Sequence, residues 1–270
     1  MLKIATPKNM DKTVDKHIGR TGRAINYLDG KHISRLESFA EDFDVVMRFR
    51  SADIPVKVRD ICDVGIVGRD WVREKQIELP GLKLEVLDEY IYGREFFTDP
   101  RLEFIVSEEE QTQSPQELAP GIVSGEYTAL MIKYLQENGW SDRIVQLGAN
   151  GAPSDPKEFR RFCVEKGLMG LDIVHGTLSE IVNAGSGYGF MVSETNGTKD
   201  DNGVRALDVI IDAHPLLVAD PDALTDERLG PAIFRLRDEL RQAYELYFDP
   251  EVHKRQIETE PPAFLSKERG

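Results

Sequence analysis

The stretch RSADIPVKVRDICDVGIVGRD, residues 50–70, reads as a charged loop, a short helix and a strand in sequence order. Pro55 suits the first turn of the helix, where its missing N–H would have no partner, and Asp53 suits the N-cap. The apolar run 64–67 predicts a buried strand, and Gly65 lets another backbone or a ligand approach it closely. Because α/β sheets bind their ligands at strand ends, we expect a site where this strand ends.

Short apolar runs and amphipathic stretches alternate on both sides of this segment. The amphipathic stretches carry apolar residues at helical spacing. Such alternation predicts an α/β architecture with mainly parallel sheets. The polar segment 107–120 predicts either a surface loop or a crossing between two lobes. The predicted strands are 2–5, 43–49, 64–67, 82–86, 104–106, 122–123, 144–147 and 190–192, and the clearest predicted helices are 127–138, 156–166 and 226–248.

Composition limits the possible functions. The chain has 270 residues, of which 40% are hydrophobic, and a formal net charge of −14. This length and apolar content predict a globular protein with a sizeable core. The negative charge argues against sequence-independent nucleic-acid binding and against attraction to anionic lipid. Any phosphate must therefore be held by a few local basic groups and backbone amides.

The sequence also predicts a cytoplasmic location. The first residues, MLKIATP, contain no apolar secretory segment, and no apolar run approaches the roughly 20 residues of a membrane span. Cys62 and Cys163 lie 101 positions apart in sequence, each in apolar or amphipathic surroundings. We expect both to be reduced core residues.

A second informative stretch is VSETNGTKDDNGV, residues 192–204. An apolar strand-like run gives way here to hydroxyls, a carboxylate and glycine. Thr195 and Thr198 bracket Asn196 and Gly197, where the backbone can turn its N–H groups inward, and a helix could begin shortly afterwards. The pattern is typical of a phosphate-binding loop. An Asn-Gly pair is also common in hairpin turns, so spacing alone leaves both interpretations open.

Three stretches in the correct order resemble the ATP phosphoribosyltransferase family, the first enzyme of histidine biosynthesis. They are the opening Lys3-Ile-Ala-x-Pro-Lys8, the pair Arg50-x-x-Asp53-Ile-Pro and Asp63-Val-Gly-Ile-Val-Gly-x-Asp70, and the loop that begins at Glu194. The family's phosphoribosyl-binding loop reads approximately Glu-Thr-Gly-x-Thr-Leu-x-x-Asn-Gly-Leu. The resemblance covers roughly residues 1 to 248.

The resemblance implies two periplasmic-binding-protein-like lobes with an active site in the cleft between them. Lobe I would comprise 1–106 and 206–250, lobe II would comprise 107–205 with the phosphoribosyl loop, and 251–270 would be a tail. The roughly 20 residues after residue 249 are too few for the family's ferredoxin-like regulatory domain, so the chain resembles the short-form catalytic subunit. That form implies a homo-oligomer, or a complex with a synthetase-like regulatory subunit.

The implied reaction is attack by N1 of ATP on C1′ of 5-phosphoribosyl 1-pyrophosphate, with pyrophosphate leaving together with Mg²⁺. Positioning and electrostatics dominate such chemistry. Arg50 and Glu194 would be the catalytic residues. The nucleotide and pyrophosphate would contact Lys8, Arg50, Arg69 and Asp70, and the phosphoribosyl group would contact Glu194, Thr195, Asn196, Gly197, Thr198 and Lys199.

The sequence departs from the family pattern close to the residues that would contact the acceptor or the ribose. Acidic residues usual before the loop correspond here to positions near Gly187 and Met191, and the loop's leucine is Lys199, a further donor for phosphate. Residues 149–175 resemble an insertion. Two alternatives therefore stay open: a phosphoribosyltransferase with another nitrogen heterocycle as acceptor, and a non-catalytic two-lobed protein that binds a small molecule.

Overall fold

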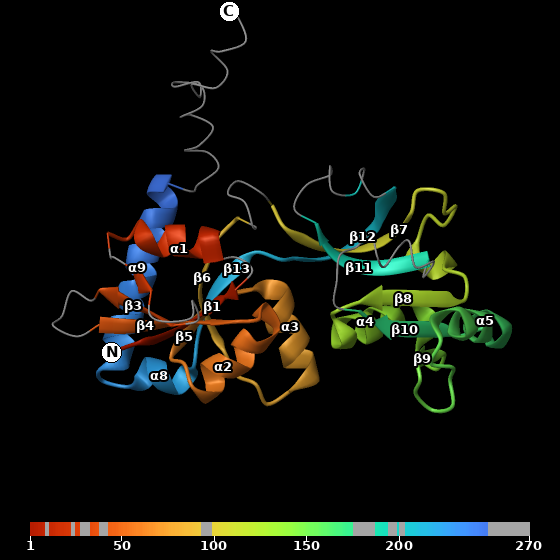
Figure 1. Cartoon of the computed structure of the whole chain (residues 1–270), viewed down its shortest axis with the longest axis horizontal. Helices are drawn as coiled ribbons and strands as arrows, with labels where there is room; N and C mark the ends of the chain where they lie inside the picture. Colours follow the sequence, from red (N-terminus) through yellow and green to blue (C-terminus); the bar gives the residue numbers. More distant parts are fainter. Residues whose placement is uncertain are drawn as a thin grey trace, which may run out of the picture. The chain divides into compact units, whose positions relative to one another are not determined.

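The computed structural model divides into two compact units, which we describe separately (Figure 1). It describes residues 1–8, 11–22, 25–27, 33–37, 43–92, 99–174, 187–193, 199 and 203–247. Unit 1 comprises Met1–Gly68, Leu82–Asp99 and His214–Gly270, and unit 2 comprises Arg69–Gly81 and Pro100–Ala213. Both units combine a β-sheet with helices, so the predicted two-lobed α/β class is confirmed.

The described residues of unit 1 form a seven-stranded sheet with the order β2-β3-β4-β1-β5-β13-β6. Its centre is parallel, because β1 pairs in parallel with both β4 and β5. The outer pairs are antiparallel. The strands are β1 (Lys3–Pro7), β2 (Ile25–Tyr27), β3 (Ile33–Glu37), β4 (Phe43–Phe49), β5 (Val64–Gly68), β6 (Glu85–Glu89) and β13 (Pro215–Ala219).

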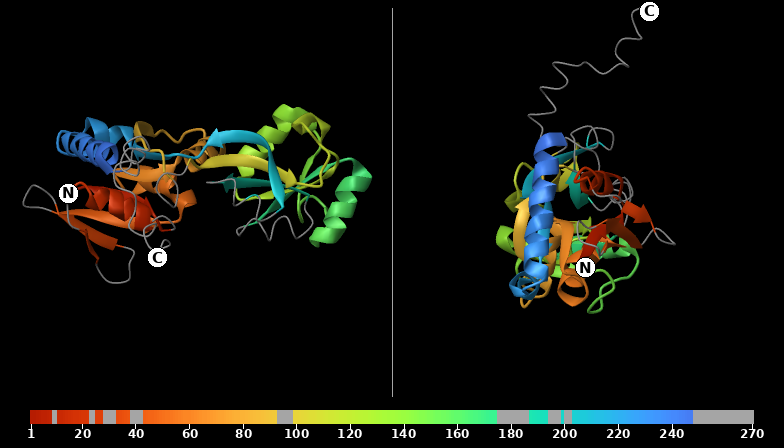
Figure 2. Two further views of the ribbon diagram at one scale, coloured as in Figure 1. Left: turned by 90° about the horizontal axis from the view of Figure 1, so that it is seen from above. Right: turned by 90° about the vertical axis from the view of Figure 1, so that its left-hand side faces the viewer.

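Helices complete unit 1. They are α1 (Asp11–Gly19), α2 (Ile54–Asp60), α8 (Pro221–Thr225) and α9 (Leu229–Tyr247), and the short 3-10 turn η2 (Ser51–Asp53) precedes α2. The long helix α9, blue in Figures 1 and 2, packs against α1, α8 and β6. Its apolar residues, such as Ile233 and Leu240, share one buried cluster with the apolar residues of β1, β4 and β5. The helical spacing that predicted 226–248 reflects this buried face.

Gly65 on β5 explains how closely α2 can pack on the sheet. A Cβ atom built at this position would lie 2.6 Å from Cγ2 of Val58 and 3.0 Å from Cγ2 of Ile54, both on α2. Pro55 is buried in the first turn of the same helix, as the sequence predicted. The close neighbour of this glycine is therefore a helix of the same unit.

The described residues of unit 2 form a six-stranded sheet with the order β12-β7-β11-β8-β10-β9. The segment β11-β8-β10-β9 is parallel, whereas β7 pairs antiparallel with both β11 and β12. The strands are β7 (Arg101–Ser107), β8 (Gly121–Gly125), β9 (Ile144–Gln146), β10 (Met169–Ile173), β11 (Gly187–Ser193) and β12 (Val204–Asp212). The expectation of mainly parallel sheets was therefore wrong, because antiparallel strands flank the parallel part of both sheets.

Unit 2 has three main helices among its described residues: α3 (Arg69–Glu78), α4 (Thr128–Leu135) and α5 (Pro156–Lys166). The bounds of α5 agree with the sequence prediction because strong end signals flank it. Asp155 accepts N–H bonds at the N-terminus, and Gly167 adopts the left-handed conformation at the C-terminus. The first predicted helix, 127–138, is a shorter α4 followed by the wide turn η4 (Gln136–Trp140), in which Gly139 has a φ of 92°.

The contacts divide the chain at positions other than those expected from the resemblance. β7 and β12, which run from Arg101 and up to Asp212, are strands of the unit 2 sheet, so this unit extends beyond 107–205 at both ends. It also includes α3, which was expected in lobe I. The segment 107–120 stays within unit 2 as a loop that contains η3 (Pro115–Glu117) and accepts hydrogen bonds from Arg205 at the carbonyls of Glu110 and Thr112.

The segment 149–175 is part of the unit 2 core. It contributes α5 and β10, and β10 lies between β8 and β9 in the sheet. Phe159 and Cys163 of α5 are fully buried against it. Cys62 of unit 1 is also buried, so both cysteines are core residues, as predicted. The tail 251–270 lies outside the described residues.

Candidate functional site

Lys8 and Arg50 emerge at the same end of two neighbouring strands in unit 1. β1 and β4 run parallel with Pro7 opposite Phe49, and each basic residue follows directly after one of these partners. Both side chains are exposed, and 77% of the Arg50 side chain is accessible. The register thus brings together two predicted anion-binding residues at a carboxyl edge of parallel strands, where α/β sheets hold their ligands.

Asp53 interacts with Arg50 instead of capping α2. Nε of Arg50 donates to Oδ2 of Asp53 at 3.0 Å, and the Asp53 side chain makes no hydrogen bond to the first turn of the helix. The side-chain capping role predicted for Asp53 was therefore wrong. Because the pair is exposed, its ion-pair energy is small, and an anionic ligand can compete for the guanidinium.

Asp70 is a buried carboxyl group in the first turn of α3. Only 3% of the residue is exposed, and the hydroxyl of Tyr127 donates to Oδ2 of Asp70 at 2.5 Å. Burial raises the pKa of Asp70 to about 6, although the bond from Tyr127 lowers it. Burial also raises the pKa of Tyr127 well above its usual value. A buried carboxyl group that titrates near neutrality is typical of functional sites, but structural networks show the same property.

Glu74 joins α3 to α4 one turn further along. Its carboxylate accepts the backbone N–H groups of Ala129 at 2.9 Å and Leu130 at 2.8 Å, which belong to the first turn of α4. Tyr127, the N-cap residue of α4, supplies no side-chain cap. The indole of Trp71 also lies against Tyr127, with ring centroids 4.4 Å apart. These contacts fix α3 on α4, and with it Asp70 and the half-buried Arg69.

The predicted phosphate loop lies largely outside the described residues. Glu194, Thr195, Asn196, Gly197 and Thr198 belong to the parts of the chain that the structure does not describe. The residues on either side of them are described. Ser193 ends β11, and Lys199 follows the five positions directly.

Ser193 and Lys199 contact the same carboxylate, that of Glu103. The hydroxyl of Ser193 donates to Oε2 at 2.5 Å, and Nζ of Lys199 lies 3.0 Å from Oε1 and 2.8 Å from Oε2. Glu103 is 4% exposed. The sequence interpretation of Lys199 as a further donor for phosphate is therefore incomplete, since its ammonium already forms an ion pair within unit 2.

Glu103 was not singled out by the sequence analysis. It lies on β7 directly opposite Met191 of β11, so both side chains point to the same face of the sheet. Met191 occupies one of the positions where the family pattern predicted an acid. The signal available in the sequence was a lone carboxylate inside the otherwise apolar run LEFIV, residues 102–106.

The second position without its expected acid, Gly187, has a φ of 89°. L-residues rarely adopt this conformation, so an aspartate would be strained there. The absence of an acid at 187 therefore agrees with the local backbone. A carboxylate in contact with Ser193 and Lys199 is supplied by Glu103 on the neighbouring strand β7.

The described carboxylates near the loop and α3 do not fit a dedicated magnesium site. Magnesium prefers oxygen ligands and usually uses one or two carboxylates together with substrate phosphates. Both oxygens of Glu103 contact Lys199. The Asp70 carboxyl group is buried and bonded to Tyr127. We therefore assign no protein ligand to the magnesium that the family resemblance implies.

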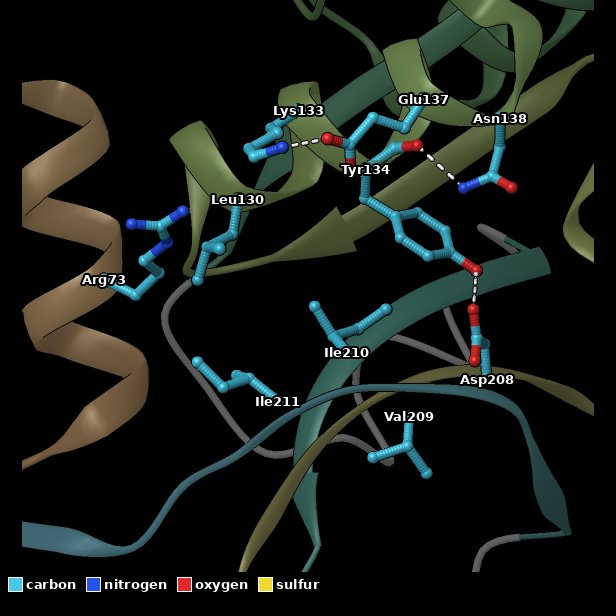
Figure 3. A pocket seen from close by; sticks show the side chains of 10 residues that line it. All are labelled: Arg73, Leu130, Lys133, Tyr134, Glu137, Asn138, Asp208, Val209, Ile210 and Ile211. Atoms are coloured by element: carbon cyan, nitrogen blue, oxygen red, sulfur yellow. Dashed lines mark hydrogen bonds and ion pairs between the residues drawn. The ribbon is translucent and has the colours of Figure 1, made fainter.

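A pocket of about 390 Å³ opens between α3, α4 and β12 in unit 2 (Figure 3). Leu130, Ile210 and Ile211 supply its apolar side, and Tyr134 donates to Asp208 at 3.0 Å across it. The register of β12 shifts twice beside this pocket, which bends the strand. None of the site residues predicted from the sequence lines this pocket.

Comparison with known proteins places these observations in context. The family model described as ATP phosphoribosyltransferase matches residues 50–152. An ATP phosphoribosyltransferase of Methanopyrus kandleri is 26% identical over 231 residues, which cover 84% of this chain and 68% of that protein. One of Stenotrophomonas maltophilia is 33% identical over 124 residues, which cover 43% of this chain and 39% of that protein. The chain thus spans less than half of the second relative.

Solved structures show the same fold. The ATP phosphoribosyl transferase (HisG:HisZ) complex of Thermotoga maritima contains a chain that matches with a TM-score of 0.64 at 17% identity, over 91% of this chain and 99% of that one. The periplasmic aliphatic sulphonate binding protein of Escherichia coli matches with a TM-score of 0.51 at 12% identity, over 95% and 72%.

The fold is the two-lobed α/β fold that periplasmic binding proteins share. Within this class, the motifs at 50–70 and the family match indicate an enzyme that transfers a glycosyl group. Over residues 50–152 the chain is similar to the ATP phosphoribosyltransferase family. Among the described residues, no helix combines the length and apolar character needed to cross a membrane.

Proposed function

We propose that this protein transfers the 5-phosphoribosyl group of 5-phosphoribosyl 1-pyrophosphate to N1 of ATP, the first step of histidine biosynthesis. The observation that carries the proposal is the family match over residues 50–152, which includes Arg50 and the turn from β5 into α3. In the reaction the bond from C1′ to the pyrophosphate oxygen breaks and a bond from N1 to C1′ forms. The transition state carries positive charge on the ribosyl ring and negative charge on the leaving group.

The protein's contribution is then to orient both substrates and to stabilise these charges. Residues Glu194 to Thr198 hold the 5-phosphate and the ribose hydroxyls. Lys8 and Arg50 donate charge-assisted hydrogen bonds to the pyrophosphate or triphosphate oxygens. Their shared position at one edge of the unit 1 sheet supports this role. Magnesium is carried by the pyrophosphate group of the donor.

Asp70 has a different role from the basic residues. Its carboxyl group is bonded to Tyr127 and buried, and it lies in the first turn of α3. We assign it to the positioning of Arg69 and the strand end instead of direct contact with phosphate, because two anions would repel each other there.

Transfer to another nitrogen heterocycle is the second candidate. Met191 and Gly187 stand where the family pattern has acids, and Gly187 adopts a backbone conformation that disfavours a side chain. Changed contacts to the ribose or the acceptor would therefore alter the choice of acceptor more than the binding of the phosphoribosyl donor. A non-catalytic two-lobed binding protein is the third candidate, supported by the fold alone.

Pyrophosphate release from 5-phosphoribosyl 1-pyrophosphate separates these candidates. We expect release that depends on ATP, with a phosphoribosyl-ATP product detected by mass spectrometry. Release that requires another heterocycle would select the second candidate. No release with any acceptor, together with tight binding of an unrelated ligand, would reject both enzymatic functions.

We further propose that the protein assembles with copies of itself or with a synthetase-like regulatory subunit. The matching Thermotoga maritima chain belongs to a HisG:HisZ complex, which supports the second arrangement. Light scattering on the purified protein tests self-association, and a monomer at micromolar concentration would contradict it. Co-expression with a regulatory-subunit candidate from the same genome tests the mixed complex.

A further inference from the structure

Four consecutive residues of β12 line the pocket between α3, α4 and β12 (Figure 3). They are Asp208, Val209, Ile210 and Ile211. In a regular strand, successive side chains point to opposite faces of the sheet, so only two of the four would share a face. The register of β12 shifts twice within 206–211, and such bulges redirect side chains, often beside active sites. The bent strand therefore turns a continuous wall towards the pocket.

The middle of this pocket is apolar. Leu130 of α4 is 6% exposed, Ile210 and Ile211 are half-buried, and Val209 leaves 45% of its surface exposed. The volume of about 390 Å³ lies at the small end of the range for ligand sites, roughly 300–1,000 Å³. Removing these side chains from water gains hydrophobic free energy. The pocket therefore suits a ligand with a compact apolar body.

The charged groups at the pocket differ in the partners that the protein gives them. Lys133 forms an ion pair with Glu137, and Asp208 accepts a hydrogen bond from the hydroxyl of Tyr134 at 3.0 Å. Within the part of the chain that the structure describes, the Arg73 guanidinium forms neither an ion pair nor a hydrogen bond. Figure 3 shows this group extending from α3 towards α4. One cation at the pocket is therefore available to an anionic ligand.

The walls of the pocket are held by contacts within unit 2. The ring of Tyr134 stacks with Phe104 at 5.2 Å between centroids and meets Phe190 edge-on at 5.4 Å. Glu74 of α3 accepts two backbone N–H groups of α4, which fixes the helix that carries Arg73. A ligand that enters a preformed pocket loses little affinity to the ordering of the protein.

We propose that this pocket binds a small organic monocarboxylate, with the carboxylate on Arg73 and the apolar body against the isoleucines of β12. A guanidinium and a carboxylate match in two parallel hydrogen bonds. Asp208 lies across the pocket from Arg73 in Figure 3, and its negative charge repels a second anionic group. A single negative charge separates this ligand class from the phosphorylated substrates of the proposed function, and the inference does not depend on that function.

The first test is the binding of named compounds to the full-length protein. Phenylacetate and indole-3-acetate are each titrated beside the neutral amide of the same acid, and beside acetate, which lacks the apolar body. In NMR, the δ1 methyl groups of Ile210 and Ile211 report binding. Ile144 is the internal control, because its strand β9 lies at the opposite edge of the same sheet.

We expect at least one of the two acids to bind at least tenfold more tightly than its amide and than acetate. The Ile210 and Ile211 signals should shift on binding, and the Ile144 signal should not. Dissociation constants above about 10 mM for both acids would overturn the proposal. Equal affinity of acid and amide, or shifts confined to residues outside the pocket, would overturn it as well.

Variants at two exposed residues test the charge requirement. Arg73→Met keeps an apolar stem without the guanidinium, and should weaken binding of the acid at least tenfold while leaving the amide unchanged. Arg73→Lys should restore most of the lost affinity. Val209→Asp places a negative charge at the pocket and should also weaken binding of the acid at least tenfold. An unchanged Ile144 signal shows that each variant is folded.

Arg161→Met is the matched control, because Arg161 is exposed on α5 of the same unit and does not line the pocket. It should bind the acid as the wild type does. Wild-type affinity in Arg73→Met would overturn the proposal. Transfer activity plays no part in these measurements, so a failure of pyrophosphate release would reject the proposed function alone.

Discussion

The hydroxyl of Tyr127 donates a hydrogen bond of 2.5 Å to the buried carboxyl group of Asp70, and the pair joins the start of α3 to the start of α4. Glu74 makes a second link between the same helices through two backbone N–H groups. These two links fix the first turns of α3 and α4 on each other within unit 2. Both links involve carboxyl groups whose burial raises their pKa.

Asp70 should make unit 2 less stable as the pH rises from 4 to 6. Its pKa is about 6 in the folded protein and 3.8 in the reference state, so the folded state binds more protons between these values. A shift of this size corresponds to about 3 kcal/mol of the free energy of unfolding. Asp70→Asn should remove this decline, and it should be up to about 3 kcal/mol more stable than the wild type at pH 7.5.

Tryptophan fluorescence measures this effect, because the chain's two tryptophans, Trp71 and Trp140, both belong to unit 2. Urea unfolding of the wild type and Asp70→Asn at pH 4 and pH 7.5 gives the comparison. Asp142→Asn, at an exposed position of the same unit, is the control. A less stable Asp70→Asn variant at pH 7.5 would show that the bond from Tyr127 to the ionised carboxylate outweighs the cost of burial.

Arg50→Ala should lower kcat/KM for pyrophosphate release. The guanidinium is largely exposed at the carboxyl edge of the unit 1 sheet, where it can contact an anionic oxygen. Loss of a hydrogen bond to a charged group should raise the activation free energy by about 1–3 kcal/mol, which lowers kcat/KM roughly 5- to 150-fold. Arg59→Ala removes the other exposed Arg–Asp pair of this segment, Arg59–Asp60, and should leave the kinetics unchanged. Equal kinetics in both variants would remove Arg50 from the site.

His17 should give unit 1 the opposite pH dependence. Its Nε2 donates to the carbonyl of Leu240 at 2.8 Å, and its Nδ1 accepts from the hydroxyl of Tyr92 at 2.9 Å. Burial lowers the pKa of His17 to about 4, so the unfolded state binds the extra proton between pH 6.5 and 4. About 3 kcal/mol of stability present above pH 6.5 is lost as the pH falls through this range.

Amide hydrogen exchange in β1 and α9 reports the stability of unit 1. His17→Gln retains a donor for Leu240 but cannot take up a proton in the unfolded state. We expect this variant to be less stable than the wild type at pH 7 and to show little change between pH 6.5 and 4. A variant with the same acid dependence as the wild type would assign the effect to other groups.

Gly65→Ala should destabilise unit 1. The added Cβ atom would lie 2.6 Å from Val58 and 3.0 Å from Ile54, so α2 must move away from β5. Overpacking of this kind costs about 1–3 kcal/mol. Gly81→Ala is the control, because a Cβ atom there meets nothing within 4 Å. Equal thermal stability of the two variants would show that α2 adjusts without cost.

The parts of the fold that the sequence predicted have strong local signals. α5 has Asp155 and Gly167 at its ends, β5 contains only apolar residues and glycine, and β4 is apolar at five of its seven positions. β12 was not predicted because its residues follow no simple alternation. Its register shifts between Ala206 and Asp208 and again between Val209 and Ile211. Apolar side chains therefore do not alternate regularly between the two faces of the strand.

The sequence alone proposed candidate site residues only where they lie in one motif. The stretch 50–70 yielded Arg50, Arg69 and Asp70 as predicted site residues, and they stay predictions. Glu103 was missed because its role depends on the pairing of β7 with β11, two strands that are far apart in the sequence. The same holds for the contact of Asp70 with Tyr127, which joins residues 57 positions apart. Such relationships come from strand register and helix packing, which a single sequence does not specify.

Glu74→Ala should destabilise unit 2 by removing a cap that another helix supplies. Ala129 and Leu130 are in the first turn of α4, where backbone N–H groups have no partner within the helix. Glu74 is 3% exposed, so water does not readily replace its carboxylate. Loss of a cap that leaves one buried and one part-buried N–H unsatisfied predicts a loss of about 2–3 kcal/mol in the free energy of unfolding.

Glu74→Gln separates the cap from the charge. The amide oxygen still accepts one N–H group, but the second N–H loses its partner and the favourable interaction with the helix dipole disappears. We expect Glu74→Gln to lower the free energy of unfolding by about half as much as Glu74→Ala does. Urea unfolding with tryptophan fluorescence measures both. Glu137→Gln, in the turn η4 that follows α4, is exposed and should change the stability by less than about 0.5 kcal/mol. An alanine variant within that same margin would show that α4 is held by its apolar face, and that Glu74 contributes no net stability there.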